Sequence, residues 1–395
     1  MLHHRVFRAV PRSFNCHLGR RSQLIRPQCS RTLLNAMTIG SPQFRAFSLE
    51  AMHPVLLAPM VFTGLLLGLW AYKCAIMVIF QNRIIYMPSI PPFSRSETLE
   101  TYRQFHHGIT WGSETLKTPD NHRLTVGIAH RPPLKDIRIK HNLNILFLQG
   151  NASSLPPRTP TISRILRDLP PHLDIHFYAL SYRGFWTSTG RASPKGIAID
   201  TKAFLSTYMK RSSQPIDDSR NLETLLLWGQ SIGSGILLSG LSSLHSLPSS
   251  SKDPHAMILE TPFPSIQKAL TSLYPQRWLP YRYLGPFVQR GGWNVMALSN
   301  RQWRLDCGKG GGVLVLEAGN DEVLGDGMGE MVEGVMRERL GEMGMREKVE
   351  RVVVKGAGHS EAAEKGRGRV VEWVSRVVRE REKDSEDNTS GLHHQ

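Results

Sequence analysis

The chain has 395 residues and a formal net charge of +16, a length that allows one large core with room for tails. Eight arginines and no acidic residue occur in residues 1–49, so half of the excess charge belongs to the N-terminal segment, and the remainder carries no nucleic-acid-binding motif. Only Cys307 of the four cysteines lies in the part expected to be globular, which excludes a disulfide framework and a paired-cysteine zinc site. The other cysteines are Cys16, Cys29 and Cys74.

The N-terminal segment, residues 1–49, is rich in Arg and Ser and lacks acids, which is the composition of a mitochondrial transit peptide. Residues 45–48, Arg-Ala-Phe-Ser, resemble a matrix-processing site. We therefore expect a mitochondrial protein. If translation starts instead at Met37 or Met52, this segment is upstream sequence and an endomembrane location follows.

An almost unbroken apolar run extends over residues 54–80, with Lys73 as its only charge. At a rise of about 1.5 Å per residue, a helix of this length crosses a hydrocarbon core about 30 Å thick. A core helix would show one polar face, and this run shows none. The run predicts a single transmembrane helix, and its orientation stays open because basic residues are present on both sides.

Prolines punctuate residues 81–96, which we expect to form an extended connector over the surface. The globular domain is expected over residues 97–382. Near its end, residues 366–382 alternate charged and apolar side chains with the spacing of a helix packed on a sheet. The polar residues 383–395 are expected to be a disordered tail.

Six short apolar runs alternate with longer segments able to form helices, and their apolar character on both faces is typical of buried strands. The runs are 143–148, 173–180, 222–228, 256–259, 313–316 and 349–354. Such alternation predicts an α/β fold with a mostly parallel central sheet flanked by helices. Before these runs, residues 110–131 contain an Asp120-Asn121 turn between two strand-like stretches, which predicts an antiparallel hairpin at the sheet edge.

Directly after the third run, residues 229–233 read Gly-Gln-Ser-Ile-Gly and match the pattern G-x-S-x-G. The strand-to-helix turn of this motif is strained, and only small flanking residues let the Ser hydroxyl project above the sheet. The N–H groups at the start of the following helix also favour developing negative charge. We therefore expect Ser231 to be a nucleophile.

A serine nucleophile needs a histidine base and an acid that orients it, and on this kind of sheet they follow in the order Ser, acid, His. Asp321 follows the run 313–316, and His359 follows the run 349–354. Three strand ends thus deliver Ser, Asp and His to one edge of the sheet. Glu322 is the rival acid, and Asp321 is preferred because it comes first after the strand.

Acyl transfer also needs two N–H donors aimed at the tetrahedral oxyanion. The backbone of Ile232, directly after the nucleophile, should provide one, and the backbone of Asn151, in the loop after the first run, the other. No His or carboxylate cluster has metal-ligand spacing, and no phosphate-binding loop follows a strand, so no cofactor or metal is expected.

With these residues the chain resembles the membrane-anchored eukaryotic α/β-hydrolase-domain proteins, relatives of monoacylglycerol lipases, lysophospholipases and protein depalmitoylases. The resemblance covers roughly residues 80–378. It is carried by FQNRIIYMPSIPP after the apolar run, LQGNASS, SYRGFWTSTG, GQSIGSG, ETPF, GNDE and GAGHSE. Two positions depart from the family: Gln149 stands where His is usual, and Asp120-Asn121 stands where Asp-Gly is preferred.

The resemblance implies the α/β-hydrolase fold, with a small cap between strands 6 and 7, in residues 261–303, whose aromatics could line an acyl channel. It also implies a serine hydrolase (lipase, esterase or palmitoyl-protein thioesterase) that acts on esters or thioesters of lipid acyl chains at a bilayer. The alternative is a non-catalytic, membrane-tethered scaffold that kept the fold, for which Gln149 is the only support.

Overall fold

The computed structural model describes residues 54–134, 141–212, 222–244, 253–288, 293–295, 303–308 and 310–391. The chain divides into two units, Met1–Met60 and Val61–Gln395, and the sheet and the candidate site both lie in the second. The basic segment with Cys16 and Cys29 lies outside the described residues, so mitochondrial targeting stays a prediction.

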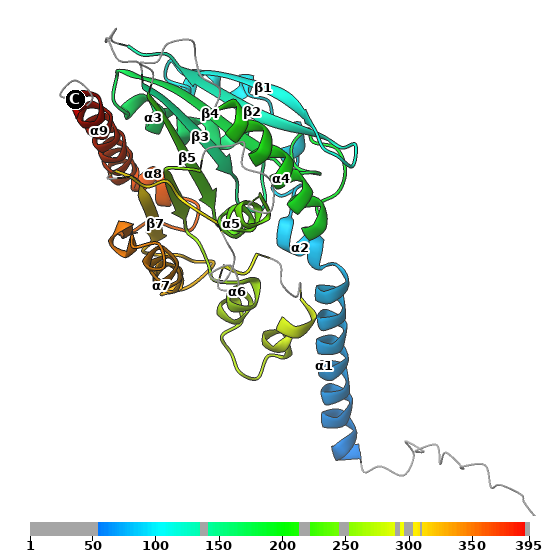
Figure 1. The fold of residues 1–395 in the computed structure, drawn as a ribbon. Coiled ribbons are helices and arrows are strands. Elements are labelled where there is room, and N and C mark those ends of the chain that lie inside the picture. Colours follow the sequence, from blue (N-terminus) through cyan, green and yellow to red (C-terminus); the bar gives the residue numbers. More distant parts are fainter. Residues whose placement is uncertain are drawn as a thin grey trace, which may run out of the picture. The chain divides into compact units, whose positions relative to one another are not determined.

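An eight-stranded sheet forms the centre of the second unit, in the order β1-β2-β4-β3-β5-β6-β7-β8 (Figure 1). β2 pairs antiparallel with both β1 and β4, whereas all other neighbours are parallel. The strands are β1 (Thr110–Lys117), β2 (Arg123–Arg131), β3 (His141–Leu148), β4 (Leu173–Ser181), β5 (Leu222–Gln230), β6 (Ala256–Glu260), β7 (Gly312–Ala318) and β8 (Val349–Val354). The predicted α/β class, with a mostly parallel sheet and an edge hairpin, is confirmed.

The central strands are buried because their side chains are apolar on both faces. Successive side chains of a strand point to opposite faces, so Leu146 and Leu148 of β3 enter one core while Ile145 and Phe147 enter the other. β8 departs from the expected burial, since only its two end residues are buried. It is the edge strand and pairs with β7 alone, which leaves its middle partly open.

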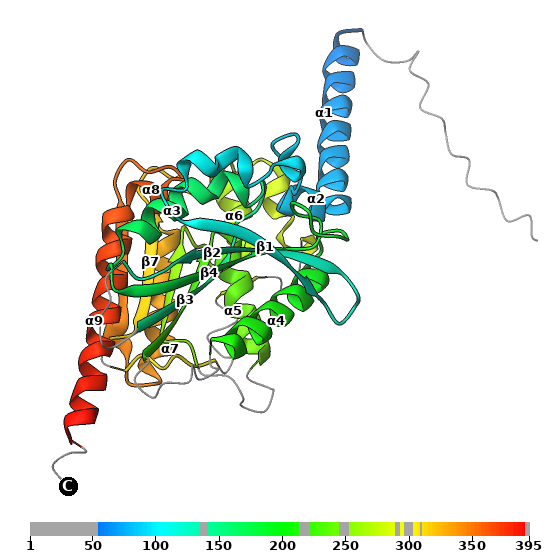
Figure 2. The ribbon, with the colours of Figure 1, turned by 90° about the horizontal axis from the view of Figure 1, so that it is seen from above.

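Helices cover both faces of the sheet, as the view from above shows (Figure 2). α4, α5 and α7 supply apolar side chains to one core, and α3, α8 and α9 supply them to the other. Their bounds are α3 (Thr159–Asp168), α4 (Pro194–Arg211), α5 (Ile232–Leu244), α7 (Met328–Gly341), α8 (Ala362–Lys365) and α9 (Arg367–Gly391). α9 begins where the periodicity predicted a helix and runs past Glu382, into the segment expected to be disordered. That extension is polar, so hydrophobic periodicity could not reveal it.

The cap segment between β6 and β7 contains α6 (Ile266–Leu273) and the short 3₁₀ turns η5 (Pro280–Tyr283) and η6 (Gly285–Phe287). Its aromatic side chains Trp278, Tyr283 and Phe287 are 66%, 59% and 64% exposed. These three aromatics therefore face outward.

The connector after the apolar run is not the extended surface segment that the prolines predicted. It contains the helix α2 (Gln81–Tyr86) and the 3₁₀ turn η2 (Ser94–Ser96), with a second turn, η3 (Glu100–Phe105), beyond it. Tyr86 is buried in the core, and Ile85 packs against that core. α2 ends before Met87, the residue that Pro88 restricts, so the prolines do not oppose the helix that carries Tyr86 and Ile85.

The apolar run forms the helix α1 (Pro54–Ile79). Within the described part of the chain it is the one helix long and apolar enough to cross a membrane, by length and composition. In its second half, the rings of Trp70 and Trp278 lie 5.9 Å apart, and Lys73 Nζ lies 4.0 Å from the ring centre of Tyr281. This half of α1 therefore contacts the cap segment.

Candidate active site

The candidate nucleophile Ser231 lies between the end of β5 and the start of α5, with a φ of 52°. Such a left-handed backbone is strained for a residue other than glycine. A Cβ atom at Gly229 would lie 2.6 Å from Ser234 Cα, and one at Gly233 would overlap the carbonyl oxygen of Leu148. The glycines are thus required because the strand, the helix and the neighbouring strand end approach one another closely at this turn.

The structure brings Ser231, His359 and Asp321 together from the ends of β5, β8 and β7. His359 Nε2 lies 2.8 Å from Ser231 Oγ, and His359 Nδ1 lies 2.7 Å from Asp321 Oδ2. Both bonds are satisfied when the Ser hydroxyl donates to Nε2 and Nδ1–H donates to the carboxylate. The Asp321 and His359 side chains are only 7% and 12% exposed, so the series is largely shielded from solvent.

The second oxygen of Asp321 is held by the turn that carries it. Asp321 Oδ1 accepts hydrogen bonds from the backbone N–H groups of Val323 and Leu324, at 2.9 and 2.8 Å. Burial acts to raise the pKa of Asp321, but the bond from His359 and these N–H groups outweigh it and hold the pKa below its ordinary value. The rival acid Glu322 accepts instead from the backbone N–H of His359 at 3.0 Å, so the two carboxylates have different tasks.

The loop after β3 lies beside Ser231, and Asn151 lines the same pocket as the candidate nucleophile. Ala152 and Ser153 both have left-handed backbones, with φ of 58° and 59°. Their N–H groups donate to the carbonyls of Tyr86 and Ile90, at 2.9 and 2.5 Å. The connector therefore holds this loop in its strained conformation.

The two predicted oxyanion donors are the backbone N–H groups of Asn151 and Ile232. Ile232 is the first residue of α5, directly after Ser231. Across the described ranges, no backbone bond outside regular elements uses either N–H group. Gln149, just before this loop, is 1% exposed and its side-chain amide has no hydrogen-bond partner within the described structure.

A pocket of about 470 Å³ opens beside Ser231 and His359. Apolar side chains form part of its wall, namely Phe147, Ile162, Ile165, Trp228 and Val323. They come from β3, α3, β5 and the loop after β7. No described residue of 261–303 lines it. The expectation that the cap aromatics line an acyl channel is therefore wrong for this pocket, because Trp278, Tyr283 and Phe287 are exposed while Tyr281 and Trp293 are buried in the core.

Three polar side chains that the sequence did not single out gather along the same pocket. Gln230 Oε1 accepts from Arg158 Nη1 at 2.7 Å, and Gln230 Nε2 donates to Glu260 Oε1 at 3.0 Å. Glu260 is 1% exposed, and burial raises its pKa against the opposing hydrogen bonds. Glu260 stands in the ETPF motif at the end of β6 and Gln230 in the GQSIGSG motif, whereas Arg158 lies in none of the quoted motifs.

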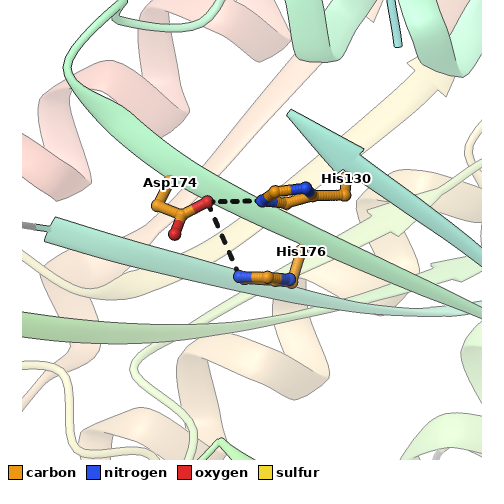
Figure 3. A group of neighbouring side chains, drawn as sticks. All are labelled: His130, Asp174 and His176. Carbon is orange, nitrogen blue, oxygen red and sulfur yellow. Dashed lines mark hydrogen bonds and ion pairs between the residues drawn. The ribbon is translucent and has the colours of Figure 1, made fainter. Parts of the chain in front are cut away.

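Among the described residues, potential metal ligands meet at two places outside the pocket. His130 of β2 and His176 of β4 are register partners, and Asp174 lies two residues before His176 on the same face. Their Nε2 atoms lie 2.8 and 3.6 Å from Asp174 Oδ1 (Figure 3). The rings stack nearly parallel, at 16° and 4.6 Å, so both nitrogens point toward the carboxylate, as in a hydrogen-bonded cluster.

The second group is His141, His172 and Glu382. Glu382 Oε1 lies 2.8 Å from a ring nitrogen of each histidine, which links α9 to β3 and to the start of β4. Spacing along the chain could not reveal either group, because the side chains come from different elements of the fold.

No protein-family model matches the chain. Among curated proteins it is similar to the alpha/beta hydrolase domain-containing protein WAV2 of Arabidopsis thaliana, 28% identical over 53% of this chain and 60% of that protein. Protein bem46 of Schizosaccharomyces pombe is 26% identical over 50% of this chain and 58% of that protein. The uncharacterized membrane protein YNL320W of Saccharomyces cerevisiae is 25% identical over 54% of this chain and 66% of that protein. The chain thus spans less than two thirds of the length of each of these relatives.

Among solved structures, an alpha-beta hydrolase from Vibrio vulnificus matches 74% of this chain and 92% of its own, with a TM-score of 0.51 and 22% identity. At 22% identity, the similarity between the two structures shows a shared fold only. Together with the sequence relatives and the mostly parallel sheet, it confirms the resemblance that the motifs predicted. By sequence the chain is similar to α/β-hydrolase-domain proteins, and its fold is the α/β-hydrolase fold.

Proposed function

We propose that the chain is a membrane-anchored serine hydrolase that cleaves carboxylic esters or thioesters of lipid acyl chains through an acyl-enzyme. The observation that carries this proposal is the hydrogen-bonded series Ser231, His359 and Asp321, with links of 2.8 and 2.7 Å beside a pocket. A serine hydroxyl alone is a weak nucleophile, and it needs a base within hydrogen-bond reach that is itself oriented by a third group.

In the first half of the reaction, Ser231 Oγ attacks the acyl carbonyl while His359 Nε2 takes its proton. The imidazolium that forms keeps its Nδ1–H bond to Asp321, whose carboxylate stabilises the new positive charge. The backbone N–H groups of Asn151 and Ile232 donate to the oxyanion of the tetrahedral intermediate. His359 then returns the proton to the departing alcohol or thiol, and the acyl group remains on Ser231.

In the second half, water replaces the alcohol or thiol. His359 Nε2 takes a proton from the water, whose oxygen attacks the acyl carbonyl and forms a second oxyanion at the same donors. Collapse of this intermediate releases the carboxylic acid and returns the proton to Ser231 Oγ. The cycle needs no group beyond these five residues and water.

The pocket supports the choice of an acyl substrate. At about 470 Å³ it falls within the range of small-molecule sites, roughly 300–1,000 Å³. Its apolar residues, among them Phe147, Ile165 and Trp228, would contact a hydrocarbon chain, while Ser231 and His359 meet the carbonyl. Monoacylglycerols, lysophospholipids and palmitoylated proteins all present such a group.

The membrane part of the proposal is supported by α1, whose exposed side chains in residues 61–79 are almost all apolar. Trp70 contacts Trp278, and Lys73 lies over the ring of Tyr281. Side chains of these types are amphipathic and are favoured at membrane interfaces. We propose a single-pass membrane protein of the mitochondrion, with an endomembrane location as the alternative if translation starts at Met37 or Met52. Sequencing the N-terminus of the mature protein distinguishes the two.

Turnover of p-nitrophenyl esters and of palmitoyl thioesters by the purified full chain in detergent tests the proposal. We expect hydrolysis by the wild type, and a loss of at least about 1,000-fold in kcat for Ser231→Ala and for His359→Ala. Circular dichroism of each variant controls for folding. A folded wild type with no activity on any ester would favour the scaffold alternative, for which the buried, unpartnered amide of Gln149 is the specific observation.

A further inference from the structure

The pocket beside Ser231 contains an arginine to which the hydrolytic mechanism assigns no role. Arg158 precedes α3 as its N-cap residue and lines the pocket together with Ser231 and His359. Its Nη1 donates to Gln230 Oε1 at 2.7 Å, and its Nη2 donates to the carbonyl of Ala152 at 3.3 Å. Its Nε is buried and has no hydrogen-bond partner within the described structure.

Among the described residues Arg158 has no carboxylate partner within 4.0 Å, in contrast to Arg164 and Arg183. Arg164, on the next turns of α3, pairs with Glu364 at 2.8 Å. Arg183 pairs with Asp200 at 2.7 Å and with Asp120 at 2.8 Å. Both partners of Arg158, an amide and a peptide carbonyl, are neutral, so its charge is not balanced by direct contact.

The carboxylate that attracts Arg158 is that of Glu260, and the Gln230 side chain lies between the two. Gln230 stands between them, accepting from Arg158 and donating to Glu260. Glu260 also accepts from Trp228 Nε1 at 3.0 Å and from the backbone of Ala363 at 3.3 Å. Its oxygens are thus used by neutral donors, and burial lowers the pKa of Arg158 despite the attraction to Glu260.

A cation that is withdrawn from water costs free energy when it is unpaired, and an anion in contact with it reduces that cost. The guanidinium group presents a planar fork of donors that matches the oxygens of a phosphate or a carboxylate. A pocket that already holds the nucleophile and an unbalanced guanidinium group suits a substrate that brings its own negative charge.

We propose that Arg158 binds an anionic group, a phosphate or a carboxylate, in the alcohol part of the ester substrate. This inference rests on the proposed hydrolase function and narrows its substrate class. It favours acyl esters with a charged alcohol part, such as lysophospholipids with a terminal phosphate, over uncharged monoacylglycerols. Arg158 is here a specificity residue that contacts substrate outside the reacting bond.

Three soluble esters that share an octanoyl chain test the proposal: those of glycerol, of glycerol 3-phosphate and of glyceric acid. They are assayed below their critical micelle concentrations with the full chain in a neutral detergent. We expect kcat/KM for a charged ester to exceed that for the glycerol ester by about 10- to 100-fold, the effect of one charge-assisted contact. Comparing kcat/KM for the glycerol 3-phosphate ester with that for the glyceric acid ester shows which anion is preferred.

Variants locate that preference at Arg158. Arg158→Gln should reduce the charged-to-neutral ratio to below about threefold, and Arg158→Lys should keep part of it, because the point charge remains. Arg167→Gln is the matched control, since it removes a positive charge from α3 at an exposed ion pair with Asp168, outside the pocket lining, and should leave the ratio unchanged. Loss of the Arg158 contacts to Gln230 and Ala152 lowers kcat/KM for all three esters alike. This general loss cancels because the ratio is taken within each variant.

Equal kcat/KM values for the three esters in the wild type, or a preference that persists in Arg158→Gln, would overturn the proposal. If Arg158→Gln does not fold, Arg158→Lys takes its place, and a ratio in Arg158→Lys equal to that of the wild type would overturn the proposal. Failure of the proposed function is a different result, in which the folded wild type hydrolyses none of the three esters and Ser231 does not react with a fluorophosphonate.

Discussion

The indole N–H of Trp293 donates a hydrogen bond of 2.8 Å to the phenol oxygen of Tyr86. The two side chains are 4% and 1% exposed. The backbone carbonyl of Tyr86 also accepts from Ala152 at 2.9 Å. Tyr86 therefore ties the segment that follows α1 both to the stretch between β6 and β7 and to the loop that carries the proposed oxyanion donor Asn151.

Replacing Tyr86 with Phe removes the phenol oxygen and leaves the buried Trp293 N–H without this partner. We expect the free energy of unfolding to fall by about 1–3 kcal/mol, measured by chemical denaturation in detergent. Activity should change little, because the contact to Ala152 is made by the backbone. The control is Tyr283→Phe, which removes a solvent-exposed hydrogen bond from the Tyr283 hydroxyl to the carbonyl of Arg277 and should cost less than about 0.5 kcal/mol. Equal effects of the two variants would contradict the role given to Tyr86.

Asp321 and Glu322 are adjacent carboxylates, and the structure gives them separate tasks. Asp321→Asn keeps the shape but loses the charge that stabilises the His359 imidazolium, so we expect kcat to fall by about 10⁴-fold. Glu322→Gln keeps an oxygen that accepts from the backbone N–H of His359, and kcat should stay within about tenfold. A larger loss in Glu322→Gln than in Asp321→Asn would show that the acid was assigned wrongly.

Gly233 follows the nucleophile by two residues, and a Cβ atom there would overlap the carbonyl oxygen of Leu148. Since the Leu148 oxygen belongs to backbone and a Cβ is fixed rigidly to its own, neither can move aside, and Gly233→Ala should cost at least about 1–3 kcal/mol of stability. Gly334 in α7 is the matched control, because a Cβ there meets nothing within 4 Å. Gly334→Ala should instead stabilise the helix by about 0.5–1 kcal/mol. Thermal melting compares the two, and an unaffected Gly233→Ala would contradict the close approach.

Asp120 accepts two hydrogen bonds from Arg183, at 2.8 and 3.1 Å, in the turn between β1 and β2. These bonds, with one from Thr118, lower the pKa of Asp120 from 3.8 to about 2. Because the folded pKa lies below the unfolded one, the ionised carboxylate contributes stability that is fully present above about pH 4 and is lost as the pH falls toward 2. Asp120 is 34% exposed, which limits the contribution to about 1 kcal/mol.

Asp120→Asn should therefore lower the free energy of unfolding at pH 6, and its difference from the wild type should shrink between pH 4 and pH 2. Glu100→Gln is the control, since its ion pair with Arg103 is about three-quarters exposed on both sides and should contribute little at any pH. A difference for Asp120→Asn that stays constant down to pH 2 would contradict the linkage.

The strands could be predicted because central strands of a parallel sheet are buried on both faces and so read as apolar runs. The same topology explains why Ser231, Asp321 and His359 could be assigned from sequence: each follows one of those runs, and the carboxyl ends of parallel strands share one edge. Distance along the chain, 38 residues between Asp321 and His359 and 128 between Ser231 and His359, is irrelevant once strand order is known.

Contacts between side chains of different elements could not be predicted. The interaction of Arg158 with Gln230, and of Gln230 with Glu260, depends on how α3 packs against β5 and β6, which no local pattern encodes. The connector was misread for a related reason. Pro88 and Pro91 restrict only Met87 and Ile90, whereas the helix at residues 81–86 carries the buried Tyr86, whose burial is a property of the whole fold.

The central claim is that Ser231 is a nucleophile activated by His359. Its most direct test is to treat the full chain in detergent with a fluorophosphonate and to identify the modified residue by peptide mass spectrometry. The account predicts one adduct, on Ser231, which is absent from Ser231→Ala and strongly slowed in His359→Ala. A folded wild type that stays unmodified, or an adduct on another residue with Ser231 intact, would contradict it.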